Sequence, residues 1–176
     1  MTTQIPAPEF SRMVDLRQIT EAPLVVSATE DERRALARRF DLVSVDRLEA
    51  TVSLIAEGAV VNATGRLSAA WVQPCAVSAE DLPVTADELI AFRFVPETRA
   101  HSPEEEVELS DTELDEIEYT GTSFDLGEAV AQSLALAIDP FAVGPEAERA
   151  RAAAGIVDEN ASGPIAALAG LKVKKD

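Results

Sequence analysis

The sequence predicts an α+β fold, in which an antiparallel β-meander packs with two or three helices and carries an acidic loop and a mobile C-terminal region. Three observations predict this fold. Residues 46–71 alternate between apolar and polar side chains, which is typical of strands that bury one face. Two segments, 29–40 and 125–138, begin with helix-capping residues and carry apolar residues at helical spacing. Ten acidic residues crowd into residues 97–118.

The first predicted helix covers residues 29–40. Thr29 and Glu32 have the spacing of a capping box, in which each side chain binds the other residue's backbone N–H. The apolar residues Leu36, Ala37 and Phe40 fall on one side of this helix. We therefore expect that side to face the core.

Residues 46–57 and 61–71 predict two strands joined in a hairpin around Gly58. A third apolar run over residues 89–95 places Ile90, Phe92 and Phe94 on one face and extends the hairpin to a meander. The residues expected on the buried face of the hairpin are Leu48, Ala50, Val52, Leu54, Ala56, Val61, Ala63, Leu67, Ala69 and Trp71.

Residues 97–118 carry a dense negative charge, because their ten acidic residues are offset by Arg99 alone. No glycine occurs in this stretch, so it lacks the turn that a calcium-binding loop needs. Two alternatives remain: a solvated, disordered loop, or a docking site for a basic partner. The candidate docking residues are Glu104, Glu105, Glu106 and Glu108.

The second predicted helix begins at Asp125, which can cap it, with Glu128 three residues later. The pair Asp139-Pro140 ends it, since proline disfavours a helical conformation in the residue before it. Its apolar stripe consists of Leu126, Val130, Leu134, Ala137 and Ile138.

The predicted domain organisation is a single α+β domain over residues 1–141, with the acidic loop 97–118 inside it. Residues 142–176 are predicted to be a flexible C-terminal region, because they are rich in alanine and have no sustained pattern. A short terminal helix is expected at the apolar piece 165–171, which is followed by Lys172, Lys174 and Lys175.

Composition narrows the class of protein. The chain has 176 residues with 15 Lys and Arg against 32 Asp and Glu, which gives a formal net charge of −17. Such a charge repels nucleic acid at long range. The first residues have neither a basic start nor an apolar stretch of signal-peptide length, and no apolar run approaches the roughly 20 residues of a membrane helix. We therefore expect a soluble, cytoplasmic protein with no membrane partner.

The chemistry-bearing residues do not indicate an enzyme. The chain has one cysteine, Cys75, and one histidine, His101, which excludes a Cys/His zinc site within it. As a nucleophile Cys75 would need a histidine partner, and His101 lies in the acidic stretch, so a buried structural thiol is the preferred interpretation. We predict no catalytic residues, no metal site and no cofactor.

A cluster of arginines on the first helix is the candidate basic site. These guanidinium groups could bind phosphates, or they could form a salt-bridged face through pairs such as Glu30 with Arg34. The candidate partner or RNA contacts are Arg33, Arg34, Arg38, Arg39 and Lys172.

Several segments, in chain order, carry a resemblance to a known bacterial family. They are 9–12 with 15–16, 32–42, 65–69, 73–77, 124–128 leading into 134–140, and 164–172. The most specific is Phe124-Asp125-Leu126-Gly127-Glu128 with the Asp139-Pro140 end of the same helix. In these segments the chain resembles the YceD-like family, named for accumulation of large-subunit (23S) ribosomal RNA. Many members have Cys-x-x-Cys where this chain has Val72-Gln73-Pro74-Cys75, so a metal or redox role of that pair cannot operate here.

The resemblance implies a role in ribosome biogenesis, linked to 23S ribosomal RNA and to a small basic large-subunit ribosomal protein. It transfers no catalytic residues. Two mechanisms stay open: the acidic chain escorts the basic ribosomal protein, or it binds ribosomal RNA directly through the arginine-rich helix. The net charge favours the protein partner.

Overall fold

The computed structural model of the chain describes residues 9–97 and 115–155. These residues form two compact units, the first comprising 9–73 and 83–139 and the second 74–82 and 140–155. None of the helices in these residues has the length and apolar character needed to cross a bilayer. The elements in chain order are β1 (Met13–Asp15), the 3-10 helix η1 (Leu16–Gln18), β2 (Leu24–Ser27), α1 (Glu30–Arg39), β3 (Ser44–Glu57), β4 (Val60–Pro74), β5 (Asp81–Pro96), β6 (Asp115–Tyr119), β7 (Ser123–Asp125), α2 (Leu126–Ala137) and α3 (Ala147–Ala153).

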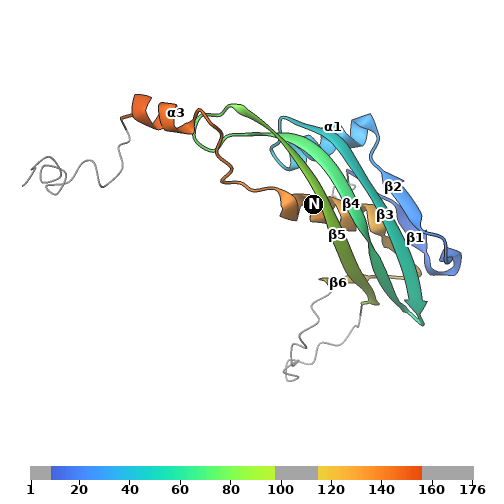
Figure 1. Cartoon of the computed structure of the whole chain (residues 1–176). Helices are drawn as coiled ribbons and strands as arrows, with labels where there is room; N and C mark the ends of the chain where they lie inside the picture. Colours follow the sequence, from blue (N-terminus) through green and yellow to red (C-terminus); the bar gives the residue numbers. More distant parts are fainter. Residues whose placement is uncertain (1–8, 98–114, 156–176) are drawn as a thin grey trace, which may run out of the picture. The chain divides into compact units, whose positions relative to one another are not determined.

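A five-stranded sheet in the order β2-β3-β4-β5-β6 dominates the fold (Figure 1). β2 and β4 each pair antiparallel with β3. The predicted α+β class is confirmed, but one strand departs from the predicted antiparallel arrangement, because β6 pairs parallel with β5. A parallel neighbour cannot follow through a tight hairpin turn, and residues 97–114 separate β5 from β6 in the sequence.

The predicted hairpin is the pair β3–β4. Gly58 has φ +67°, a left-handed conformation that glycine adopts without strain, and the register closes with Glu57 opposite Val60. Farther along the hairpin, a Cβ on Gly65 would lie 2.2 Å from the carbonyl oxygen of Thr51, so only glycine fits there. Ala56, expected on the buried face, is exposed because it lies at the protruding end of the hairpin.

The core lies on one face of the sheet, and α1 and α2 cover it (Figure 1). Alternate residues of β3, β4 and β5 point into it, as the period-2 pattern predicts. Phe94 of β5 stacks on Phe124, which precedes α2, at 4.1 Å between ring centroids. The largest fully buried side chains are Trp71, Phe10, Phe94, Phe124, Leu36, Leu48, Leu67, Leu126 and Leu134.

Both predicted helices are confirmed, together with their caps. Thr29 and Glu32 form the reciprocal capping box of α1, and the Asp125 side chain accepts from the Glu128 N–H at the start of α2. α2 ends at Ala137, just before Asp139-Pro140. These caps fix the two helix starts.

A second, two-stranded sheet pairs β1 with β7, with Val14 opposite Phe124. The sequence pattern did not indicate these two short strands. Their pairing holds residues 10–12 beside the first turn of α2, where the Leu126 N–H donates to the Arg12 carbonyl oxygen at 3.0 Å.

The second unit contains α3, which lies inside the predicted flexible region 142–176. In the same unit the Ala76 N–H donates to the Ala142 carbonyl oxygen at 2.9 Å. The predicted terminal helix at 165–171 lies outside the described residues.

Candidate functional site

The arginine-rich helix α1 is the candidate site that the sequence indicated. α1 begins at Glu30 because Thr29 caps it, and its acidic first turn and basic last turn suit the helix dipole. Arg33, Arg34, Arg38 and Arg39 all lie in the turns that follow the cap. What each guanidinium group contacts decides whether it can receive a ligand.

Arg39 is held at the protein surface by two carboxylates. Its guanidinium donates to both oxygens of Glu128, at 2.9 and 2.7 Å, and to Glu9 at 3.0 Å. These hydrogen bonds raise the pKa of Arg39 and lower the pKa of Glu128. Arg39 therefore ties α1 to α2 and to the N-terminal segment.

Arg34 and Arg33 also bind groups of the same chain. Arg34 pairs with Glu30 and, at 2.9 Å, with Asp31, as the i, i+4 spacing predicted for the first of these pairs. Arg33 donates to the carbonyl oxygen of Ala28 at 2.9 Å. In the part of the chain that the structure describes, Arg38 is the member of this cluster with no hydrogen bond or ion pair to another residue.

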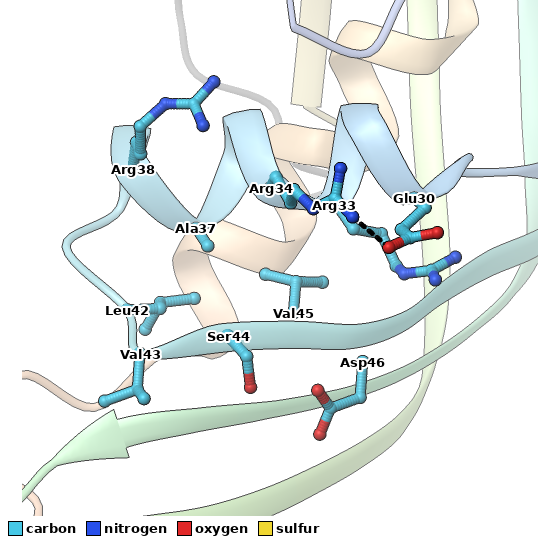
Figure 2. A pocket seen from close by; sticks show the side chains of 10 residues that line it. All are labelled: Glu30, Arg33, Arg34, Ala37, Arg38, Leu42, Val43, Ser44, Val45 and Asp46. Atoms are coloured by element: carbon cyan, nitrogen blue, oxygen red, sulfur yellow. Dashed lines mark hydrogen bonds and ion pairs between the residues drawn. The ribbon is translucent and has the colours of Figure 1, made fainter.

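A groove of about 490 Å³ runs between α1 and the start of β3 (Figure 2). Figure 2 shows Val45 and Leu42 between helix and strand, and Arg38 at the end of the helix, directed away from the strand. Two carboxylates, Glu30 and Asp46, line the groove together with the arginines. The groove thus has mixed charge, whereas a continuous phosphate-binding track would be basic. Its lining residues are Glu30, Arg33, Arg34, Ala37, Arg38, Leu42, Val43, Ser44, Val45 and Asp46.

A partly buried cluster around Arg12, which the sequence pattern did not predict, lies on the other side of α1. The Arg12 guanidinium donates to both carboxylate oxygens of Glu32, at 2.6 and 2.9 Å, and to the carbonyl oxygen of Ser27 at 2.8 Å. The Arg12 backbone N–H donates to the Asp125 carboxylate at 2.8 Å. The hydrogen bonds from Arg12 lower the pKa of Glu32 to about 2.

The neighbouring Gly127 explains why this cluster is so compact. A Cβ at Gly127 would lie 2.7 Å from the Arg12 backbone nitrogen and 2.8 Å from the Phe10 carbonyl oxygen. Arg12, Glu32, Asp125 and Gly127 all belong to the segments that resemble the YceD-like family. That resemblance was the one sequence signal for this cluster, and the geometry shows that these residues hold the N-terminal segment, α1 and α2 together.

Cys75 is buried, as predicted, in the second unit. Its Sγ accepts from the backbone N–H groups of Val77 and Ser78, both at 3.4 Å, and of Gly144 at 3.3 Å. Hydrogen bonds from Ser78 above all, and from Gly144 and Val77, lower the pKa of the thiol to about 7. Among the described residues no three His, Cys, Asp or Glu side chains are grouped as metal ligands.

Several predicted site residues lie outside the described residues. They are His101, the candidate docking residues Glu104, Glu105, Glu106 and Glu108, and Lys172.

A model of the family described as "Large ribosomal RNA subunit accumulation protein YceD" matches residues 63–172, which is more than half of the chain. The match begins in β4 and extends beyond α3. It confirms the resemblance noted in the sequence. Neither a curated protein nor a solved structure matches the chain.

Proposed function

We propose that this chain, which belongs to the YceD family of large ribosomal RNA subunit accumulation proteins, acts as a non-enzymatic factor that binds a small basic large-subunit ribosomal protein. The family gives the chain its role in the accumulation of large-subunit ribosomal RNA and so in ribosome biogenesis. The basic protein is the proposed link to that RNA.

The engagement of the arginines is the observation that supports a basic partner. Of the arginines in residues 9–97 and 115–155, all but Arg33, Arg38 and Arg47 form an ion pair with a carboxylate of the same chain. Among the described residues, several exposed carboxylates form no ion pair, such as Glu21, Asp41, Glu49 and Glu57. Such a surface attracts cationic proteins and accelerates their association.

The non-enzymatic role is supported by the small number of side chains that could act as a nucleophile or a general base, since the chain has one cysteine and one histidine. Cys75 is the one thiol of the chain, and its Sγ accepts hydrogen bonds from Ser78, Val77 and Gly144; among the described residues no histidine, lysine or carboxylate side chain bonds to it. A reactive cysteine must also be accessible to its substrate, and the Cys75 side chain is buried. We therefore assign Cys75 a structural role in the loop that contains it.

Direct binding of ribosomal RNA through α1 is the second candidate. The observation in its favour is Arg38, which is exposed beside the groove of Figure 2 and engages no other described residue. Glu30 and Asp46 in the same groove oppose it, since carboxylates repel phosphates. We place this candidate second for that reason.

One experiment separates the two candidates in cells. The tagged chain is purified from cells with and without nuclease treatment, and the bound proteins are identified by mass spectrometry. We expect a small basic large-subunit ribosomal protein to stay bound after nuclease. Its loss with the RNA would favour the second candidate.

A measurement with purified components tests the RNA candidate directly. If RNA binds through α1, the logarithm of the affinity for a 23S ribosomal RNA fragment falls with the logarithm of salt concentration, by about 0.7 to 0.9 per phosphate contact. Replacing Arg34 and Arg38 by glutamate then abolishes binding, whereas Arg17→Glu, an equally exposed control, has little effect. Under our proposal the chain binds such fragments weakly at physiological salt, with or without these changes.

A further inference from the structure

One edge of the large sheet is only partly covered. β6 pairs with β5 over Phe92–Pro96, and among the described residues no strand lies beside residues 83–91 on that side. Figure 1 shows the long strand β5 at the border of the sheet, with β6 next to one of its ends. An uncovered strand edge offers main-chain hydrogen-bonding groups to a further strand.

Two adjoining hollows lie between this edge and α2. Their volumes are about 270 and 280 Å³, and both are lined by Phe92, Ser133 and Leu136. Leu89 of β5 and Leu136 of α2, which line the same hollow, are 83% and 80% exposed. Two leucines this exposed around one hollow mark a surface suited to a partner.

The charge around these hollows selects the kind of partner. The charged side chains that line them are Glu88 and Glu116, both carboxylates. Arg93 lies 3.3 Å from Glu116, which leaves Glu88 as the carboxylate beside the exposed leucines that forms no ion pair. A segment with lysine or arginine next to an apolar side chain complements this surface.

We propose that the uncovered edge of β5 at residues 83–91 is the docking surface for an extended, basic segment of the protein partner, which adds to the sheet as a strand. The inference rests on the proposed function, because it takes the partner to be a basic protein. In an extended segment alternate side chains point to opposite sides. Glu88 and Phe92 lie an even number of residues apart on β5 and so share a face. One apolar side chain then occupies the hollow against Phe92 and Leu136, and a cation on the same face of the segment, two or four positions along it, contacts Glu88.

A second copy of the chain is a poorer occupant of this edge. It would bring its own Glu88 and a net charge of −17 against the same surface. Like charges placed together at a contact oppose association. We therefore expect no self-association through β5, and the test below includes a measurement that would detect it.

The test measures binding of the full chain, at physiological salt, to a ten-residue peptide of repeating Val-Thr-Lys-Thr, which places valine and lysine at alternate positions of one face. The test variants are Leu136→Lys, Leu89→Lys and Glu88→Lys. The controls are Val25→Lys, at an exposed position on the opposite edge strand β2, and Glu57→Lys, at the hairpin end. We expect each test variant to weaken binding at least about tenfold and each control less than about twofold, where tenfold corresponds to about 1.4 kcal/mol.

Backbone pairing is tested with a second peptide, in which alternate amide nitrogens are methylated. Strand addition predicts at least about tenfold weaker binding of this peptide, since its main chain can no longer donate. Equal affinity for both peptides would overturn strand addition. Equal losses in test and control variants would overturn the docking surface, because binding would then depend on overall charge alone.

Two further outcomes separate this inference from the proposed function. Retention of the basic ribosomal protein from nuclease-treated cells, to the same extent by the Leu136→Lys variant, would overturn the docking surface and leave the function standing. Edge-specific peptide binding without any retained basic protein would support the surface and overturn the function. A dimer in sedimentation that Leu136→Lys dissociates would overturn the inference in favour of a second copy.

Discussion

Arg12 and Glu32, 20 positions apart in the chain, form a two-pronged ion pair that joins the N-terminal segment to the first turn of α1. Their side chains are 31% and 22% exposed, so this pair is shielded from solvent better than those at the surface. Glu32 also caps the helix, because its carboxylate accepts from the Thr29 N–H at 2.7 Å. One carboxylate therefore serves both the helix and the tertiary structure.

Arg12→Ala should lower the free energy of unfolding by about 2 kcal/mol, because it removes charge-assisted hydrogen bonds to a partly buried carboxylate. Denaturant titration measures this. The control is Arg17→Ala, whose side chain is 80% exposed beside Asp15, and it should leave the free energy of unfolding nearly unchanged. Equal effects of the two changes would contradict the structural role of Arg12.

The Glu32 carboxyl predicts how stability depends on pH. Its pKa is about 2 in the folded protein, against 4.5 without these interactions. A lowered folded-state pKa stabilises the protein above pH 4.5, and this contribution is lost as pH falls from 4.5 towards 2. Glu32→Gln should therefore reduce stability at pH 7 and flatten its decline in acid. An unchanged acid decline in that variant would show that Glu32 does not carry it.

Arg39 and Arg38 are neighbours in the sequence, but we expect their replacement by alanine to change the free energy of unfolding by different amounts. Arg39→Ala removes the ion pairs to Glu128 and Glu9 and should cost about 1 to 2 kcal/mol, since these pairs are partly buried. Arg38→Ala should leave stability within about 0.5 kcal/mol. Thermal and denaturant unfolding of the two variants makes the comparison, and a costly Arg38→Ala would reveal a partner for that side chain.

Gly127→Ala tests the close approach of α2 to the N-terminal segment. Alanine in place of glycine usually stabilises a helix by about 1 kcal/mol. Here we expect destabilisation, since the new Cβ would meet backbone atoms of Phe10, Ser11 and Arg12 at less than 3.0 Å. Gln132→Ala, on the exposed side of the same helix, is the control. A stabilised Gly127→Ala variant would show that the segment can move away at no cost.

Substitutions at Leu134 and Leu136 distinguish a core position of α2 from a position on the proposed docking surface. Leu134 is fully buried, so Leu134→Asp should unfold the domain, since an unpaired buried charge costs several kcal/mol. Leu136→Asp, two positions later and exposed, should leave the melting temperature nearly unchanged. Circular dichroism during heating distinguishes them. A folded Leu134→Asp variant would mean that this stripe of α2 is not core.

The sequence by itself determined the parts of the fold that depend on neighbours in the chain. The capping box at Thr29 and Glu32, the cap at Asp125 and the alternation along β3 and β4 were readable because the groups that interact lie within a few residues of one another or repeat with a fixed period. The pair of Glu30 with Arg34 was readable for the same reason.

The tertiary structure alone decided which arginines form ion pairs and which part of β5 has no neighbouring strand among the described residues. Arg39 meets Glu128 from 89 positions away and the Arg12 N–H meets Asp125 from 113, distances at which no local pattern indicates a pair. The parallel pairing joins β5 to β6, which are separated in the sequence by residues 97–114, so periodicity within each strand could not predict it. Leu89 and Leu136 looked like ordinary apolar residues of a strand and a helix, and only the packing of α2 beside the edge of β5 leaves both exposed around one hollow.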